Sequence, residues 1–149
     1  MNFAIIFSGQ GLQNLAHVHE LRSMAEELQV LDKLKLYLPK LFCSDLTEAD
    51  LYPNEFAQPF IFFFFWCRWQ KLKPEIKDII SLSGYSLGEL SSLICATQTG
   101  LEQGLYLAQQ RASLMSSAVK QASGLMAVQG INLNILEPLL AETSITLSI

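Results

Sequence analysis

Residues 79–89 read Ile79-Ile80-Ser81-Leu82-Ser83-Gly84-Tyr85-Ser86-Leu87-Gly88-Glu89, an apolar run followed by a glycine-flanked serine and a helix-like stretch. This is the G-x-S-x-G pattern of a nucleophile elbow, in which a serine lies at a tight turn between a strand and a helix. Small residues on both sides of Ser86 let the backbone bend sharply, and the helix that follows directs free N–H groups toward the serine. The arrangement suits acyl transfer, because an oxyanion formed on an attacked carbonyl would meet hydrogen-bond donors.

The pattern alone is short, and an ordinary strand-to-helix turn is the alternative interpretation. Three fixed small residues occur by chance in many loops. Its position favours the functional interpretation, because the strand before it and the helix after it are the context that the motif requires.

Apolar runs and helical patterns alternate along the rest of the chain. This alternation predicts an α/β fold with a mostly parallel sheet, and the continuous run Phe3–Phe7 predicts a buried parallel strand. Glycines follow this first strand at Ser8-Gly9-Gln10-Gly11, where an α/β sheet presents its ligand-binding loops. Expected strands cover 3–7, 79–83, 125–130 and 145–149, and expected helices cover 15–36, 101–119 and 133–141, with a short helix and loop over 45–56 and a charged connector over 71–77.

The most hydrophobic segment, Pro59–Cys67, ends at Arg68. It falls well short of the ~20 apolar residues that cross a bilayer, so we predict a buried core helix and no membrane partner. The 149 residues are 50% hydrophobic with a net charge of −4, which allows one sizeable core and argues against a nucleic-acid partner.

Three cysteines, Cys43, Cys67 and Cys95, lie far apart in the sequence without a neighbouring histidine at ligand spacing. Neither a disulfide framework nor a zinc site is expected from this spacing. Reduced, mostly buried thiols in a cytoplasmic protein are the simpler interpretation.

Five segments together resemble the malonyl-CoA:acyl-carrier-protein transacylase family and the related acyltransferase domains of fatty-acid and polyketide synthases. They occur in the order that the family has, over nearly the whole chain. They are Phe7-Ser8-Gly9-Gln10-Gly11-Leu12-Gln13 (family F-P-G-Q-G-S-Q), Asn54-Glu55-Phe56-Ala57-Gln58-Pro59 (T-x-x-x-Q-P), Gly84-Tyr85-Ser86-Leu87-Gly88-Glu89 (G-H-S-x-G-E), Gln110-Arg111-Ala112-Ser113-Leu114-Met115 (R-x-x-x-M) and Gly124-Leu125-Met126-Ala127-Val128 (G-x-M-A-V).

The resemblance implies a role for each matched residue. Ser86 would take malonyl from malonyl-CoA as a serine ester, and the backbone N–H groups of Gln10 and Leu87 would form the oxyanion hole. Arg111 would bind the malonyl carboxylate through its planar fork of N–H donors. The acyl group would pass to the phosphopantetheine thiol of an acyl carrier protein, with no metal and no redox cofactor.

The resemblance also implies a fold with two parts. Residues 1–123 would form a parallel-sheet, α/β-hydrolase-like acyltransferase core, and residues 124–149 would begin a small ferredoxin-like subdomain.

Plainer interpretations remain open for several residues. Arg111 could be a solvated charge on a helix, Gln10 could cap a turn, and Glu89 could be a first-turn carboxylate favoured by the helix dipole. Lys71, Lys73 and Lys77 could contact an acidic carrier protein, although a solvated connector is the simpler expectation.

Departures from the family pattern qualify these implications. Tyr85 stands in the position of the usual histidine and resembles the transacylase (epsilon) subunit of malonate decarboxylase, which loads malonyl onto a carrier subunit with a modified coenzyme A group. Ser8 and Leu12 replace the usual proline and serine of the oxyanion loop.

The family's general-base histidine has no match in these 149 residues. His17 and His19 are expected to be solvated on a helix instead. We therefore expect a truncated chain with impaired turnover, with a serine hydrolase, or an inactive fragment that binds a carrier protein, as alternatives.

Overall fold

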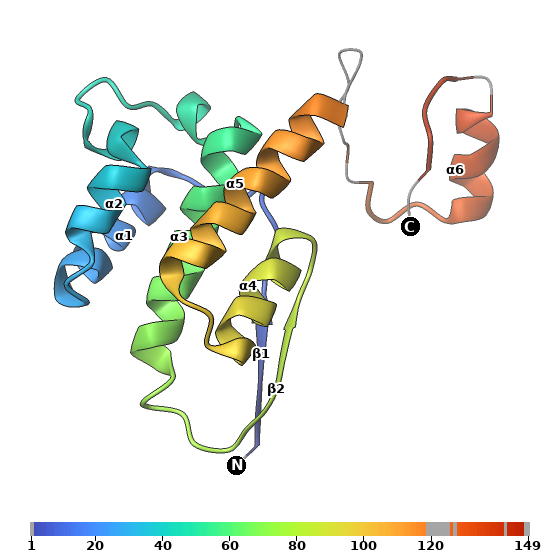
Figure 1. Ribbon diagram of the computed structural model, residues 1–149. Coiled ribbons are helices and arrows are strands. Elements are labelled where there is room, and N and C mark those ends of the chain that lie inside the picture. The colour runs from blue at the N-terminus through green and yellow to red at the C-terminus, as the bar shows by residue number, and fades with distance from the viewer. Residues whose placement is uncertain (1, 119–125, 127, 142, 148–149) are drawn as a thin grey trace. The chain divides into compact units, whose positions relative to one another are not determined.

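The computed structural model describes residues 2–118, 126, 128–141 and 143–147 of the chain. The chain forms two compact units, Met1–Ala118 and Val119–Ile149, which are described separately. The first unit holds a small parallel sheet and helices (Figure 1), so the predicted α/β class is confirmed for it. Its elements are β1 (Phe3–Phe7), α1 (Leu15–Glu27), α2 (Leu31–Tyr37), η1 (Pro39–Phe42), η2 (Glu48–Leu51), α3 (Asn54–Leu72), β2 (Ile79–Gly84), α4 (Leu87–Thr97) and α5 (Leu101–Ala118), where η denotes a 3-10 helix.

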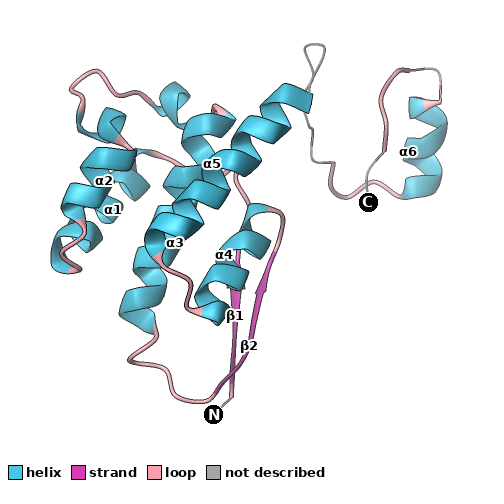
Figure 2. Cartoon of the chain, in the orientation of Figure 1, coloured by secondary structure: helices cyan, strands magenta, loops and turns pink. Residues whose placement is uncertain are grey.

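Strands β1 and β2 pair in parallel, with Phe7 opposite Gly84 at their carboxyl ends (Figure 2). The buried ring of Phe7 packs this end of the sheet against helix α3. It meets Phe65 and Trp69 edge-on, with ring centroids 5.8 and 6.5 Å away. The loop after β1 and the elbow after β2 therefore begin side by side. This is the edge at which parallel sheets bind ligands.

The prediction that the first strand is buried is wrong for all of its residues except Phe7 and the half-buried Ile5. Ile6 is 78% exposed in β1, and Ile80 is 67% exposed in β2. Successive side chains of a strand point to opposite faces. One face packs on α3 and α4 through Phe7, Ile5 and Leu82, whereas no described layer covers the face that carries Ile6.

The Phe-rich segment forms the buried helix that its length predicts. Phe60, Phe62 and Phe63 in α3 are fully buried, and helix α5 packs against them. A Cβ at Gly104 of α5 would lie 2.1 Å from the ring of Phe62, so the glycine allows the two helices to approach closely. Of the helices in the described part of the chain, none is long and apolar enough to span a membrane.

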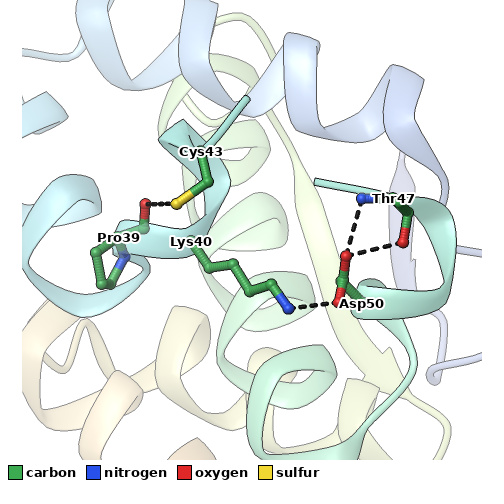
Figure 3. A network of polar contacts seen from close by, with 5 residues as sticks. All are labelled: Pro39, Lys40, Cys43, Thr47 and Asp50. Carbon is green, nitrogen blue, oxygen red and sulfur yellow. Dashed lines mark hydrogen bonds and ion pairs between the residues drawn. The ribbon is translucent and has the colours of Figure 1, made fainter. Parts of the chain in front are cut away.

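The expected helical region over 15–36 forms two helices, because Gln29 takes a left-handed conformation with φ 57° between them. The following segment, 39–51, is held by a polar network (Figure 3). The Asp50 carboxylate pairs with Lys40 and accepts from the Thr47 N–H at 2.9 Å and the Thr47 hydroxyl at 2.8 Å. The hydrogen bond from Lys40, followed by those from Thr47, lowers the pKa of Asp50 to about 2.

The second unit contains helix α6 (Leu133–Leu140), which confirms the helix expected over 133–141. The strands expected over 125–130 and 145–149 are absent from their described residues, 126, 128–130 and 145–147. A strand needs a neighbour for its backbone hydrogen bonds, and the described residues of this unit offer none. The predicted boundary at 123/124 lies outside the described residues. The connector expected over 71–77 begins later, because α3 continues to Leu72.

Candidate active site

Ser86 lies at the junction of β2 and α4 in an unusual backbone conformation, with φ 55° and ψ −114°. Such a conformation costs a non-glycine residue of order 1–3 kcal/mol and persists only where the surrounding structure imposes it. The strand and the helix impose it here, because Tyr85 N–H donates to the Phe7 carbonyl at 3.1 Å and Gly88 N–H donates to the Tyr85 carbonyl at 2.9 Å. The predicted tight bend at the serine is therefore present.

The two glycines of the motif are required by close backbone approach. A Cβ at Gly84 would lie 2.0 Å from the carbonyl group of Gly88, and a Cβ at Gly88 would lie 2.1 Å from the carbonyl oxygen of Phe7. Real Cβ atoms do not make contacts this short. The start of α4 is thus pressed against the ends of both strands, which an ordinary turn does not require.

The start of α4 places a backbone N–H group next to Ser86. Leu87 is the first residue of the helix, and the first N–H groups of a helix have no intrahelical acceptor. The Ser86 N–H is occupied, because it donates to Oε1 of Glu89 at 3.1 Å. Glu89 therefore has a specific partner and does more than favour the helix dipole.

Arg111 of α5 points at the serine. Its Nη2 donates to Ser86 Oγ at 3.1 Å, and its Nη1 donates to Gln58 Oε1 at 2.8 Å. The Gln58 side chain is fully buried, and its Nε2 lies 3.2 Å from the sulfur of Met115. The guanidinium is half-buried and held in place, so the interpretation of Arg111 as a solvated charge is wrong.

Gln58 is the site residue whose role was missed from the sequence. In the sequence, Gln58 stands only as part of the segment 54–59 that resembles the family pattern. The signal that could have found it is an amide side chain within an otherwise aromatic, buried helix, since buried polar groups require partners.

The loop after β1 lies against the elbow. The Cβ position of Gly9 is 3.2 Å from the Tyr85 carbonyl and 3.5 Å from Ser86 Cβ, and Gly11 has φ 128°. Gln10 does not cap a turn through its side chain, because Nε2 donates to Asn54 Oδ1 at 3.0 Å. The loop that carries Gln10 therefore lies beside Tyr85 and Ser86 at Gly9.

The histidines lie elsewhere. His17 Nδ1 accepts from the Asn14 N–H at 3.3 Å at the start of α1, and its ring packs against Phe64 with centroids 5.0 Å apart. His17 is therefore a helix-capping residue, not a solvated one as expected, and His19 is exposed. Arg111 is the one described side chain that is hydrogen-bonded to Ser86 Oγ.

The described residues also contain a cavity and a charged connector. A cavity of about 230 Å³ is lined by Ser8 and Gly9 among others, but neither Ser86 nor Arg111 lines it. Lys71 of the connector pairs with Glu27 at 2.6 Å. Within the described ranges, no three His, Cys, Asp or Glu side chains gather at one place where a metal ion could be held.

Comparison with known proteins places this geometry in a family, although no family model matches the sequence. The chain is 32% identical over 133 residues to the malonyl CoA-acyl carrier protein transacylase of Bacillus subtilis, covering 85% of this chain and 33% of that protein. It is 28% identical over 137 residues to the probable mitochondrial malonyl-CoA-acyl carrier protein transacylase of Drosophila melanogaster, covering 83% and 35%.

Solved structures show the same likeness. The malonyl CoA-acyl carrier protein transacylase of Clostridium perfringens matches with a TM-score of 0.60 at 26% identity, over 97% of this chain and 47% of that one. The acyl carrier protein S-malonyltransferase of Vibrio cholerae matches with a TM-score of 0.57 at 29% identity, over 80% and 40%. The chain thus spans less than half the length of these relatives. Taken with the elbow and the arginine that points at its serine, this likeness shows that the chain belongs to the malonyl-CoA:acyl-carrier-protein transacylase family.

Proposed function

We propose that this chain belongs to an acyltransferase that moves malonyl from malonyl-CoA to the phosphopantetheine thiol of an acyl carrier protein through an ester on Ser86. The observation that carries the proposal is the hydrogen bond of 3.1 Å from Arg111 Nη2 to Ser86 Oγ. A permanent cation at the nucleophile suits an acyl group with a carboxylate, and it has no use in a hydrolase of neutral esters. The relatives described above are transacylases of this class.

The short malonyl group fits this distance. Only one methylene separates its carboxylate from its thioester carbonyl. A carboxylate bound to the Arg111 guanidinium would therefore bring the carbonyl carbon within reach of Ser86 Oγ. Because Gln58 Oε1 holds Nη1 at 2.8 Å, the guanidinium keeps its orientation while Nη2 exchanges the serine hydroxyl for the carboxylate.

The reaction would proceed in two balanced steps. Ser86 Oγ attacks the thioester carbonyl, the carbon–sulfur bond breaks, and coenzyme A leaves as a thiol that carries the serine proton. The phosphopantetheine thiol then attacks the carbonyl of the malonyl ester, the bond between this carbon and Ser86 Oγ breaks, and the thiol proton passes to Ser86 Oγ as the malonyl thioester forms. The N–H groups of Gln10 and Leu87 would stabilise the oxyanion in both steps.

Transfer of the Ser86 proton is the step for which the described residues show no base. No described histidine is hydrogen-bonded to Ser86, and a serine enzyme that lacks a member of its triad keeps only ~10³ to 10⁴-fold over the uncatalysed rate. We therefore propose that the 149 residues form the malonyl ester slowly.

Intact-protein mass spectrometry after incubation with malonyl-CoA tests the proposal. We expect one malonyl adduct, which Ser86→Ala abolishes and Arg111→Ala weakens, and a much smaller yield from acetyl-CoA, which lacks the carboxylate. An Arg111→Lys control keeps the charge but loses the planar fork. An acetyl adduct that forms as fast as the malonyl adduct, and is insensitive to Arg111→Ala, would favour the hydrolase alternative instead.

Two finer assignments extend the proposal. Tyr85 is 77% exposed beside the nucleophile, so it can contact whichever carrier delivers the acceptor thiol. Transfer from the malonylated chain to an acyl carrier protein, compared with transfer to a malonate decarboxylase carrier subunit, distinguishes the two acceptors. For the fold, we propose an α/β-hydrolase-like core over 1–123 and the beginning of a ferredoxin-like subdomain over 124–149.

A further inference from the structure

The loop that carries Gln10 is fastened by two side-chain amides. One belongs to Gln13, which is only 5% exposed. Its Oε1 accepts from the Gly11 N–H at 2.7 Å, and its Nε2 donates to the Leu51 carbonyl at 3.0 Å. The side of the loop that follows Gln10 is therefore tied to the segment that precedes α3.

The second amide belongs to Asn54, the first residue of α3. Its Oδ1 accepts from Gln10 Nε2 at 3.0 Å, and its Nδ2 donates to Ser116 Oγ on α5 at 3.5 Å. Ser116 also hydrogen-bonds to the Glu55 carboxylate, and this bond lowers the pKa of Glu55. Asn54 thus connects the Gln10 side chain to the helix that carries Arg111.

We propose that Asn54 is a positioning residue for acyl transfer, which holds the Gln10 side chain so that the Gln10 N–H stays directed at the site beside Ser86. This inference rests on the proposed function, in which that N–H stabilises the oxyanion. Gln10 is exposed and lies between two glycines, so its backbone has many accessible conformations. Loss of one restraining hydrogen bond lets the donor move, and displacement of a catalytic group by about 1 Å can cost up to ~10²-fold in rate.

The magnitude follows from the kind of bond that is lost. A neutral hydrogen bond at the surface contributes modestly, so Asn54→Ala should slow malonylation of Ser86 by about 3- to 10-fold. The malonyl-CoA concentration that gives half the maximal rate should not change, because Arg111 and Gln58 remain in place. Arg111→Ala should instead raise that concentration.

A double-mutant cycle separates positioning from a general structural role. Gln10→Met keeps the length of the side chain and removes the amide that bonds to Asn54. If Asn54 acts through that amide, the double variant is no slower than Gln10→Met alone. Losses that multiply would overturn the proposal.

Hydrogen exchange provides a test that needs no activity. Asn54→Ala should speed amide exchange in residues 8–13, while Gln70→Ala, near the other end of α3, should leave this segment unchanged. Unchanged exchange in Asn54→Ala would overturn the proposal. A wild-type chain that forms no malonyl adduct would count against the proposed function, and the exchange comparison would then decide whether Asn54 holds the loop.

Discussion

Replacing Gly104 by alanine tests whether the spacing of α3 and α5 sets the site. The added Cβ would lie 2.1 Å from Cζ of Phe62, whose ring is fully buried, so the ring or the helix must move by roughly 1 Å or more to restore an ordinary contact of 3.4 Å. Overpacking of this kind costs about 1–3 kcal/mol, against a gain of about 1 kcal/mol from the better helix propensity of alanine. We expect a net loss of up to about 2 kcal/mol in the free energy of unfolding.

The same substitution should reach the active site. Phe62 lies one helical turn from Gln58, and Gly104 lies two turns from Arg111, so a wider gap between α3 and α5 lengthens the contact from Nη1 to Gln58 Oε1, now 2.8 Å. The malonyl-CoA concentration that gives half the maximal rate of Ser86 malonylation should therefore be higher for Gly104→Ala than for the wild-type chain.

Urea unfolding followed by circular dichroism measures the stability, with Gly100→Ala as the control. Apart from its chain neighbours, Gly100 has no atom within 4 Å of its Cβ position, so this control should change stability by less than about 1 kcal/mol. Combining Gly104→Ala with Phe62→Leu makes room for the new methyl group, and the double variant should be more stable than the two single losses predict. Strictly additive losses in the double variant, or a Gly104→Ala chain that is more stable than wild type, would refute the reasoning.

Two further predictions concern thiols and acid. Burial raises the pKa of the Cys67 and Cys95 thiols to about 12, so at pH 8 a maleimide should label the exposed Cys43 first. Mass spectrometry should show that Cys43→Ser abolishes the fast phase of labelling. Rapid labelling of that variant would contradict the burial of Cys67 and Cys95. The pKa of Asp50 is lowered from 3.8 to about 2, chiefly by Lys40. A carboxylate with a lowered pKa in the folded state stabilises the fold at pH values above its unfolded pKa, and this stabilisation is lost as the pH falls through its folded pKa. Asp50→Asn should thus lower the thermal midpoint at pH 6, and its difference from wild type should shrink between pH 4 and pH 2; a pH-independent difference would argue against the carboxylate contacts.

Local sequence was sufficient for the elements near the nucleophile. The elbow was predictable because its requirements are local: an apolar strand, glycines at two positions and a helix start all lie within residues 79–89. The Phe-rich helix was predictable for the same reason, since the length of its apolar run separates a core helix from a membrane span.

Other features depend on contacts between distant residues. The exposure of Ile6 could not be predicted from the run Phe3–Phe7, because it depends on how many layers surround the sheet. Gln58 and Asn54 have partners that no periodicity indicates, because they bond to residues 53 and 44 positions away. Side chains this far apart in sequence meet only after the helices pack.

The chain itself specifies the turn at Ser86, because steric limits on glycine and the directions of strand and helix act over neighbouring residues. Packing of α3 against α5 brings Arg111 to within 3.1 Å of the serine hydroxyl. Close approach at Gly104 and Phe62 allows α3 and α5 to lie close together. The side chain of Gln58 on α3 can therefore hold the guanidinium of Arg111 on α5, which no local sequence pattern specifies.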